Sequence, residues 1–344
     1  MKRKHSVFLP MVIVAVLVFL VSFNIGRYRV NPLTACKILI SKGIELVTGG
    51  RYALEKTWTD AEAVVVINIR FPRIVAAFMI GASLSLSGAS YQAIFRNPMV
   101  SPDLLGASSG AGFGAAIALF LGGNYFTVTL SSFLFGLSAV FLAILISRLS
   151  PINQTLSFVL AGVMVSSLYS SATSFIKLIA DTDSTLPAIT YWLMGSLSSI
   201  KMKDLQFAFI PILIGAVPIF LLRWRINLLS LTDSEARSMG VNTSRLRIVV
   251  ILSSTLMTAA SVSISGMIGW VGLVIPHFSR LIIGVDNRKV LPSTILLGGS
   301  FLLFVDNLAR IITTSELPLG ILTSFIGAPV FLYLIITGGR ENEA

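Results

Sequence analysis

Ten apolar runs, each long enough for a helix that crosses a bilayer core of about 30 Å, constrain this chain more than any other feature. They cover residues 7–25, 64–90, 104–121, 127–147, 155–180, 205–222, 248–265, 267–283, 291–308 and 317–337. Only 12% of the residues are charged, roughly half the fraction found in soluble domains. The sequence therefore predicts an all-α polytopic membrane protein with ten transmembrane helices, folded as a single membrane-embedded domain over residues 1–344.

The residues that flank the runs predict the orientation of the chain. Basic residues precede the first run and no small-residue cleavage site follows it, so we interpret this run as a span and not as a signal peptide. Ten spans place both termini on one side, and the basic short loops favour the cytoplasm for that side. The stretch 27–63 and the loop 181–204 are then external. Tyr191 and Trp192 in this loop predict an interfacial helix, either at the mouth of a pathway or as an aromatic anchor.

A polar segment at residues 226–247 interrupts the apolar runs. Its pattern predicts a short helix over residues 233–239, with Gly240 at its end because glycine readily adopts positive φ. A second helix follows and continues into the next span. The capping residues are Thr232 and Glu235 for the first helix, and Asn242 or Thr243 for the second. The segment is either a simple cytoplasmic connector or a compact helical knob that a cytoplasmic partner grips.

A short pattern recurs within the apolar runs. Residues 82–88 (ASLSLSG) match residues 260–266 (ASVSISG), an offset of 178. Two further matches share this offset, Pro98 with Pro276 and residues 104–106 with 282–284. Five predicted spans separate the two copies, so the second copy must cross the membrane in the opposite sense. This predicts an inverted-topology repeat, an architecture that many transporters use.

The chain offers no set of residues for catalysis or metal binding. It has one cysteine, and its two histidines are far apart in sequence, so no metal-ligand spacing exists. Asp103 and Asp306 lie at the ends of predicted spans and no carboxylate lies in the middle of one, which disfavours an ion-gradient-driven secondary transporter and a membrane enzyme. A Walker A sequence is absent, so another polypeptide must supply the energy for active transport. The basic residues mostly flank apolar runs, which argues against nucleic acid as a partner.

Several motifs stand in a fixed order between Arg70 and the C-terminus. They are FPR at 71–73, GASYQAIFRNP at 88–98, LLGASSGAG at 104–112, YWLMG at 191–195, ARSMGV at 236–241, GLVIPH at 272–277, ELPLG at 316–320 and GAPVF at 327–331. With these motifs the chain closely resembles the FecCD-type permeases, a family that includes the vitamin B12 transporter permease. Proteins of this family are the membrane subunits of ABC importers for iron-siderophores, haem and cobalamin.

The resemblance implies a type II ABC importer permease in a bacterial or archaeal cytoplasmic membrane. Such a permease pairs with a second permease subunit, identical or paralogous, and forms the translocation pathway along the dimer axis. Two ATP-binding subunits, which use ATP and Mg, lie below it, and an extracytoplasmic solute-binding protein docks above it. The chain itself would bind no cofactor. Its cargo would be an iron chelate, haem or a corrinoid.

The resemblance also implies roles for particular residues. Arg70, Arg73 and Arg310 match the outward-facing arginines that receive glutamates of the binding protein in this family, through exposed and individually weak ion pairs. The cytoplasmic gate corresponds to Asn97, Asn153, Gln154 and Thr155. The ATPase-coupling helix corresponds to Asp233, Ser234, Glu235, Ala236, Arg237, Met239 and Gly240. His277 follows Pro276 in the family pattern, and we expect it to be packed and hydrogen-bonded rather than a ligand.

Overall fold

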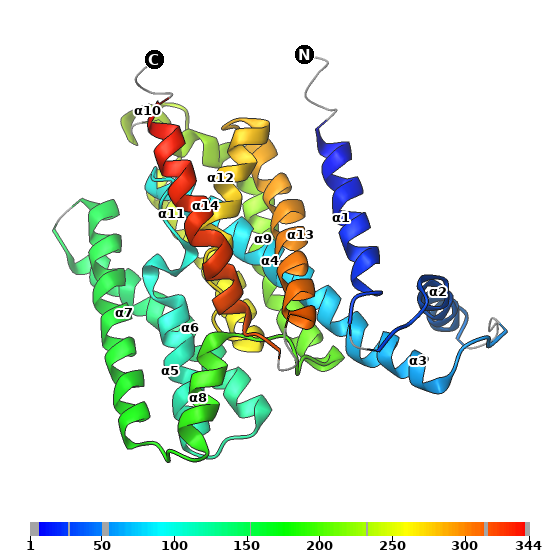
Figure 1. Ribbon diagram of the computed structural model, residues 1–344. Helices are drawn as coiled ribbons and strands as arrows, with labels where there is room; N and C mark the ends of the chain where they lie inside the picture. The colour runs from blue at the N-terminus through cyan, green and yellow to red at the C-terminus, as the bar shows by residue number, and fades with distance from the viewer. Residues whose placement is uncertain are drawn as a thin grey trace.

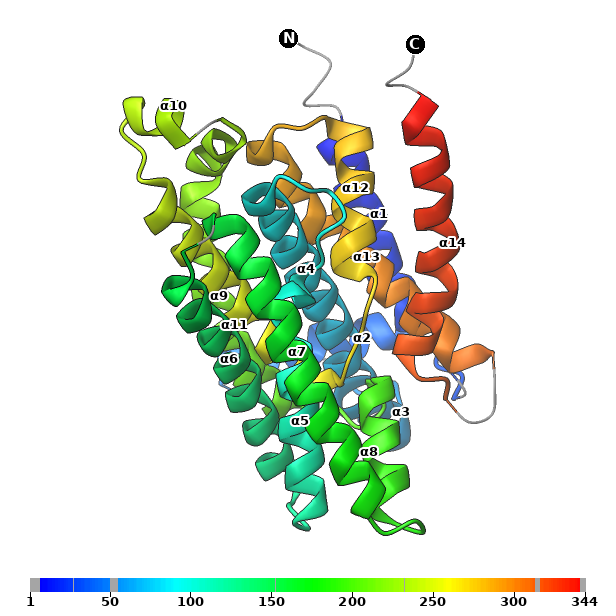
Figure 2. The same ribbon diagram turned by 90° about the vertical axis from the view of Figure 1, so that its left-hand side faces the viewer.

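The chain folds into a bundle of long helices, seen in the computed structural model (Figures 1 and 2). The structure describes residues 7–26, 28–49, 55–151, 153–231, 233–312 and 316–340, and within these ranges it contains helices, turns and loops but no strand. This confirms the all-α fold class expected from the apolar runs.

A helix lies at each of the ten predicted spans. They are α1 (Phe8–Ser22), α4 (Phe71–Phe95), α5 (Ala107–Phe120), α6 (Tyr125–Leu149), α7 (Gln154–Ile179), α9 (Met202–Asn227), α11 (Thr243–Ser265), α12 (Val271–Ile283), α13 (Asn287–Ile311) and α14 (Leu319–Arg340). Six helical stretches in the described ranges are long and apolar enough to cross a membrane alone, and α1, α5, α12 and α14 are the sites of shorter apolar helices. The ten-helix arrangement therefore agrees with the sequence prediction.

Shorter helices lie between the spans. They are α2 (Pro32–Thr48), α3 (Asp60–Val64), the π-helix η1 (Val65–Arg70), η2 (Pro102–Leu105), α8 (Thr185–Met194), η3 (Leu228–Ser230) and α10 (Asp233–Ser238). Asn31 begins α2 by accepting a hydrogen bond from the Leu33 N–H, and Thr59 forms a capping box with Glu62 at the start of α3. The π-helix then joins α3 to α4, so the second membrane helix starts earlier than the apolar run indicates.

The two ends of the bundle differ. α1 begins and α14 ends at one end, where α10 also lies, and we call this end the terminal face (Figure 1). α8 and the α2–α3 segment lie toward the other end, which we call the opposite face (Figures 1 and 2). The stretch 27–63 and the loop 181–204 are thus on the same side of the bundle, as the predicted topology requires.

The two copies of the repeat lie against each other at the centre of the bundle. The Ser261 hydroxyl donates a hydrogen bond of 2.9 Å to the Ser83 hydroxyl, and these two residues are equivalent at the offset of 178. Farther along α4, Ser87 donates to the Ser254 carbonyl at 3.2 Å. Because residue numbers rise along α4 while they fall along α11, the two helices are antiparallel. This is the relation that an inverted repeat predicts.

Close approach of helix backbones holds this centre together. A Cβ atom on Gly88 would lie only 1.8 Å from the Gly272 carbonyl oxygen in α12, and a Cβ on Gly81 would lie 2.2 Å from the Gly298 carbonyl oxygen in α13. Only glycine fits at these two positions of α4. Small residues at helix contacts are typical of membrane bundles, because association there depends on van der Waals packing and hydrogen bonds.

Ser261→Ala is expected to lower the free energy of unfolding by only about 0.6 kcal/mol, because a hydrogen bond between membrane helices is worth little net of alternative partners. Unfolding in mixed detergent micelles measures the change. Ser174→Ala is the matched control, since this exposed α7 hydroxyl bonds only to the Ser170 carbonyl within its own helix. A loss equal to that of the control would show that the contact between the repeats contributes nothing.

Candidate functional site

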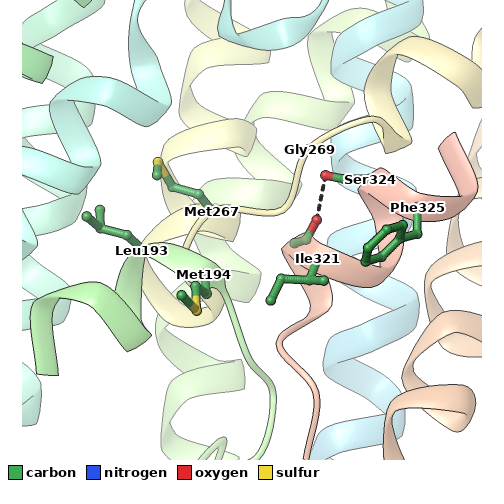
Figure 3. A pocket seen from close by; sticks show the side chains of 8 residues that line it. Leu193, Met194, Met267, Gly269, Ile321, Ser324 and Phe325 are labelled. Atoms are coloured by element: carbon green, nitrogen blue, oxygen red, sulfur yellow. Dashed lines mark hydrogen bonds between the residues drawn. The ribbon is translucent and has the colours of Figure 1, made fainter. Parts of the chain in front are cut away.

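A cavity of about 580 Å³ opens between α8, α14 and the linker that joins α11 to α12. Figure 3 shows side chains from α8 on one side and from α14 on the other, with Met267 and Gly269 of the linker between them. The lining residues are Leu193, Met194, Met267, Gly269, Gly320, Ile321, Ser324 and Phe325. None of them is charged, and Ser324 directs its hydroxyl to the Gly320 carbonyl at 2.7 Å. The wall is therefore apolar with two thioethers.

Backbone contacts fix the three segments around this cavity. The Leu319 N–H donates to the Gly195 carbonyl at 2.8 Å, which joins the start of α14 to the end of α8. The Ser196 N–H donates to the Ser265 carbonyl at 2.8 Å, which joins the same loop to the end of α11. A Cβ atom on Gly320 would lie 2.6 Å from the Met194 carbonyl oxygen, so glycine is needed for this approach. These backbone contacts therefore fix the positions of the three segments that carry the lining side chains.

A helix is present in the loop 181–204, as the sequence predicted, and its interfacial position stays a prediction. α8 lies in the loop 181–204 and brings Leu193 and Met194 to the cavity, while Tyr191 is exposed. The contributions of Met267 and Ser324 were missed. The one sequence signal for this region was the glycine that ends each of the YWLMG and ELPLG motifs, Gly195 and Gly320. In the fold, Gly195 contacts the start of α14 and Gly320 contacts the end of α8.

Charged residues gather at the opposite face, where α1 and α13 end and α4 begins. Arg73 donates to Asp306 through Nε at 2.9 Å and to both Glu316 carboxylate oxygens through Nη1 at 2.8 Å. Arg310 forms an ion pair of 2.8 Å with the other Asp306 oxygen. Asp306 has no exposed surface, so this carboxylate binds two guanidinium groups away from water.

The same cluster holds the end of α1. Arg70 donates hydrogen bonds to the carbonyl oxygens of Phe23 and Tyr28, and Arg310 donates to the Ile25 carbonyl at 3.1 Å. These carbonyls follow the last turn of α1, where the backbone has no partner within the helix. The arginines therefore fasten the first helix to α4 and α13.

The structure corrects one premise about the three arginines assigned to docking. Arg70, Arg73 and Arg310 do lie together at one face, but they are only 4%, 6% and 7% exposed, whereas exposed ion pairs were expected. The reason is that Asp306 and Glu316 balance the charges of Arg73 and Arg310 within the chain. Asp306, placed at a span end by the sequence, is inside α13. A docking role for these arginines stays a prediction.

The predicted coupling segment forms a short helix at the terminal face. α10 spans Asp233–Ser238, and Gly240 follows it with φ +79°, as expected for a glycine that ends a helix. Asn242, one of the two predicted caps of the next helix, accepts a hydrogen bond from the Arg245 N–H at 3.1 Å. Thr232 lies outside the described residues, so the capping box at this helix is not described.

α10 presents a polar surface to its surroundings. Ala236 is buried against the bundle. The exposed residues of the segment are Ser234, Glu235, Arg237, Ser238, Met239 and Gly240. A short helix anchored by one small buried residue, with its polar face outward, has the form of the compact knob considered from the sequence. Which partner contacts it stays a prediction.

The four predicted gate residues lie at two places near the terminal face. Asn97 follows α4, accepts a hydrogen bond from the Met99 N–H, and lines a small cavity beside α12. Asn153 caps α7 by accepting from the Thr155 N–H at 2.9 Å, and Gln154 accepts from the Ser244 hydroxyl at 3.3 Å. None of the hydrogen bonds seen among the described residues joins Asn97 to this second group. Their role as a gate stays a prediction.

The loop between α12 and α13 contains a carboxylate whose pKa is lowered to about 2. The main cause is the hydrogen bond from Arg288 to Asp286, with a further bond of 2.8 Å from Asn227. Because the folded pKa lies below the unfolded value of about 3.9, the ionised group stabilises the fold above pH 4, and this contribution is lost as pH falls toward 2.

Asp286→Asn is therefore expected to reduce the acid sensitivity of the protein between pH 4 and 2. Thermal unfolding of the detergent-solubilised wild type and variant at pH 5, 4, 3 and 2 measures this. The variant should be less stable than the wild type at pH 5, and the difference should shrink as pH falls because the wild-type carboxylate becomes protonated. A difference that stays constant over this range would contradict the assignment.

The FecCD transport family matches residues 13–337 of the chain. The chain belongs to the FecCD transport family. The molybdate import system permease protein MolB of Haemophilus influenzae is 38% identical over 330 residues, covering 95% of each chain. A Helicobacter pylori permease protein named for iron chelatin transport is 44% identical over 273 residues, covering 79% of this chain and 82% of that protein.

A solved structure supports the FecCD assignment at the level of the fold. It is an inward-facing conformation described as a metal-chelate type ABC transporter, with 36% identity and a TM-score of 0.85, and the match covers 96% of this chain and 99% of that chain. The resemblance stated from the motifs is thereby confirmed. The protein is an ABC importer permease of the FecCD family, a membrane transport subunit. The relatives differ in the cargo for which they are named, so they do not determine the cargo of this chain.

Proposed function

We propose that this chain forms the translocation pathway of an ATP-driven importer, with the terminal face in the cytoplasm of a bacterial or archaeal cell. Two ATP-binding subunits grip α10 and hydrolyse ATP with Mg, and a solute-binding protein delivers cargo at the opposite face. The observation that carries this proposal is α10, an exposed polar knob at the terminal face of a bundle whose sequence contains no Walker A motif. Closure of the partner subunits would move α10 and then the gates.

A second copy or a paralogue of the permease completes the pathway in this proposal. In Figure 2, α7 lies toward the viewer and α14 at the right-hand edge, and both helices carry large exposed apolar side chains. Those on α14 include Phe325, Leu332, Tyr333 and Ile336. The cavity with Phe325 in its wall would then face the dimer axis.

An iron chelate, haem or corrinoid is the cargo class that we favour. A wall of apolar groups and thioethers offers no charge-assisted hydrogen bond, which recognition of a small bare oxyanion would need. The cavity of about 580 Å³ is also large enough for a substantial part of a chelate. Molybdate is the second candidate, because a relative named for molybdate import matches nearly the whole chain.

Reconstituted uptake tests the proposal. Proteoliposomes would contain the chain and its cognate ATP-binding subunits, with MgATP trapped inside and the cargo-loaded binding protein outside. Uptake of labelled ferric chelate should need MgATP, and labelled molybdate should not enter. Uptake of molybdate without uptake of the chelate would show that molybdate, and not a chelate, is the cargo. Uptake driven by a proton gradient without ATP-binding subunits would overturn the proposal in favour of a secondary transporter.

A further inference from the structure

A second cavity, of about 290 Å³, lies at the terminal face where the ends of α4, α9 and α12 meet the start of α13. α12 packs against the second half of α4, and both helices end at this face (Figure 2). Two arginines, Arg96 and Arg280, line the cavity together with the amide side chains of Gln92, Asn97 and Asn287. This cavity is therefore polar and cationic, whereas the cavity between α8 and α14 is uncharged.

Arg280 is a half-buried cation held by a neutral partner. Its Nη1 donates to the Gln92 Oε1 at 2.6 Å. Gln92 is fixed in turn, because its Nε2 donates to the carbonyl oxygens of Val100 and Leu273, each at 3.2 Å. No carboxylate of the described chain lies within ion-pair distance of Arg280. A guanidinium group withdrawn from water in this way lacks the counter-charge that buried cations ordinarily have.

Arg96 is positioned at the cavity by an uncommon backbone conformation. It ends α4 with φ +49°, in the left-handed region that favours glycine. Its side chain donates to the Leu229 carbonyl at 2.5 Å and to the Leu231 carbonyl, both in the segment that follows α9. Strained residues of this kind persist where the surrounding structure holds them, and they are common at binding sites. Arg96 therefore forms a fixed part of the wall.

The acidic group beside the wall residue Asn287 does not supply the missing charge. Asp286 is adjacent to Asn287, but its carboxylate accepts hydrogen bonds from Arg288 and Asn227. The carbonyl ends of α4 and α12 point toward this face and oppose an anion, whereas the N–H end of α13 at Asn287 favours one, so the guanidinium groups are the main charged ligands. Guanidinium groups bind oxyanions through paired, charge-assisted hydrogen bonds.

We propose that this cavity binds a tetrahedral oxyanion of the phosphate class, with Arg280 as the main ligand and Arg96, Asn97 and Asn287 completing the wall. A cavity of this size holds such an anion with some water. The anion could be free in solution, or it could be the phosphate of a lipid headgroup. The site does not depend on the proposed ATP-driven transport, because the anion is bound by the resting permease.

Anion binding to the purified, delipidated chain tests the proposal. Inorganic phosphate is titrated at constant ionic strength against sodium chloride, and thermal stability gives the apparent affinity. Arg280→Gln should weaken phosphate binding by roughly tenfold or more, which corresponds to about 1.4 kcal/mol. Arg288→Gln is the matched control, since this arginine in the first turn of α13 is exposed and paired with Asp286. It should bind phosphate like the wild type.

A second variant separates loss of binding from loss of folding. Asn97→Asp keeps the oxygen that accepts from the Met99 N–H and adds a carboxylate to the wall. It should weaken phosphate binding while leaving the phosphate-free protein at least as stable as the wild type, because the carboxylate replaces the anion. The proposal is overturned if phosphate stabilises the wild type no more than sodium chloride, or if both variants bind phosphate like the wild type.

Native mass spectrometry then identifies the source of the anion. Wild type and Arg280→Gln are each exposed to phosphatidylglycerol and taken through the same detergent wash. Retention of the lipid by the wild type alone, with release by added phosphate, identifies a headgroup site. Equal retention by both proteins, together with the Arg280-dependent phosphate affinity, identifies a site for a free anion.

Discussion

Asp306→Asn is expected to lower the free energy of unfolding by about 3–5 kcal/mol, because the change removes the charge that neutralises two buried arginines. Arg73 and Arg310 would then face each other with only Glu316 nearby. Removing one member of a buried ion pair is costly, since the remaining charges stay out of water without compensation. Unfolding of the purified protein in mixed micelles measures the loss.

Glu316→Gln is the matched control for this prediction. Glu316 also pairs with Arg73, at 2.8 Å, but its side chain is 32% exposed, so water can solvate Arg73 when the charge is removed. The loss should be well below that of Asp306→Asn. Equal losses of unfolding free energy for the two variants would show that the buried Asp306 carboxylate stabilises the cluster no more than the part-exposed Glu316 carboxylate does.

Gly240→Pro is expected to reduce ATP-driven uptake by roughly tenfold or more, because proline cannot adopt positive φ and lacks an N–H group. Gly240 has φ +79° and donates its N–H to the Arg237 carbonyl at 2.9 Å. A Cβ atom at this position would meet nothing within 4 Å, so the bundle itself should stay folded. The change would therefore reorient α10 and leave the pathway intact.

Gly122→Pro provides the matched control at the other end of the bundle. Gly122 has φ +72°, donates its N–H to the Leu119 carbonyl at 3.0 Å, and likewise has open space around its Cβ position. The two variants impose the same backbone conflict. In the reconstituted importer, Gly240→Pro should hydrolyse ATP without uptake, whereas Gly122→Pro should transport. Equal transport by both variants would show that α10 has no part in energy coupling. It would leave the ATP requirement of the wild type unaffected.

The helices of this fold could be predicted because each of them is encoded locally. An apolar run must form a helix in a bilayer, where every backbone polar group needs a partner, so the spans follow from the sequence alone. The relation between α4 and α11 was also predictable, since the repeated ASLSLSG pattern implies opposite directions. The contact between Ser83 and Ser261 then places equivalent residues face to face.

The charged cluster and the two cavities could not be predicted, because they depend on residues that are distant in sequence. Arg73 meets Asp306 across 233 positions, and Arg280 meets Gln92 across 188. The local pattern alone predicts that Arg73 is exposed, since it stands near the edge of an apolar run. Only the packing of α4 against α13 shows that it is buried. The bounds of α10 and the start of α11 were easier to predict, because Gly240 and Asn242 act on their own backbone neighbours.

The fastening of α1 has a consequence for the order in which the protein is assembled. Asn307 donates to the Ser22 hydroxyl at 2.8 Å and Arg310 to the Ile25 carbonyl, so groups made early in synthesis are held by groups made almost at its end. Until the ribosome has passed α13, the first helix lacks these partners. A nascent chain halted before Asn307 should therefore leave α1 accessible to membrane chaperones, and completion of α13 should release it from them.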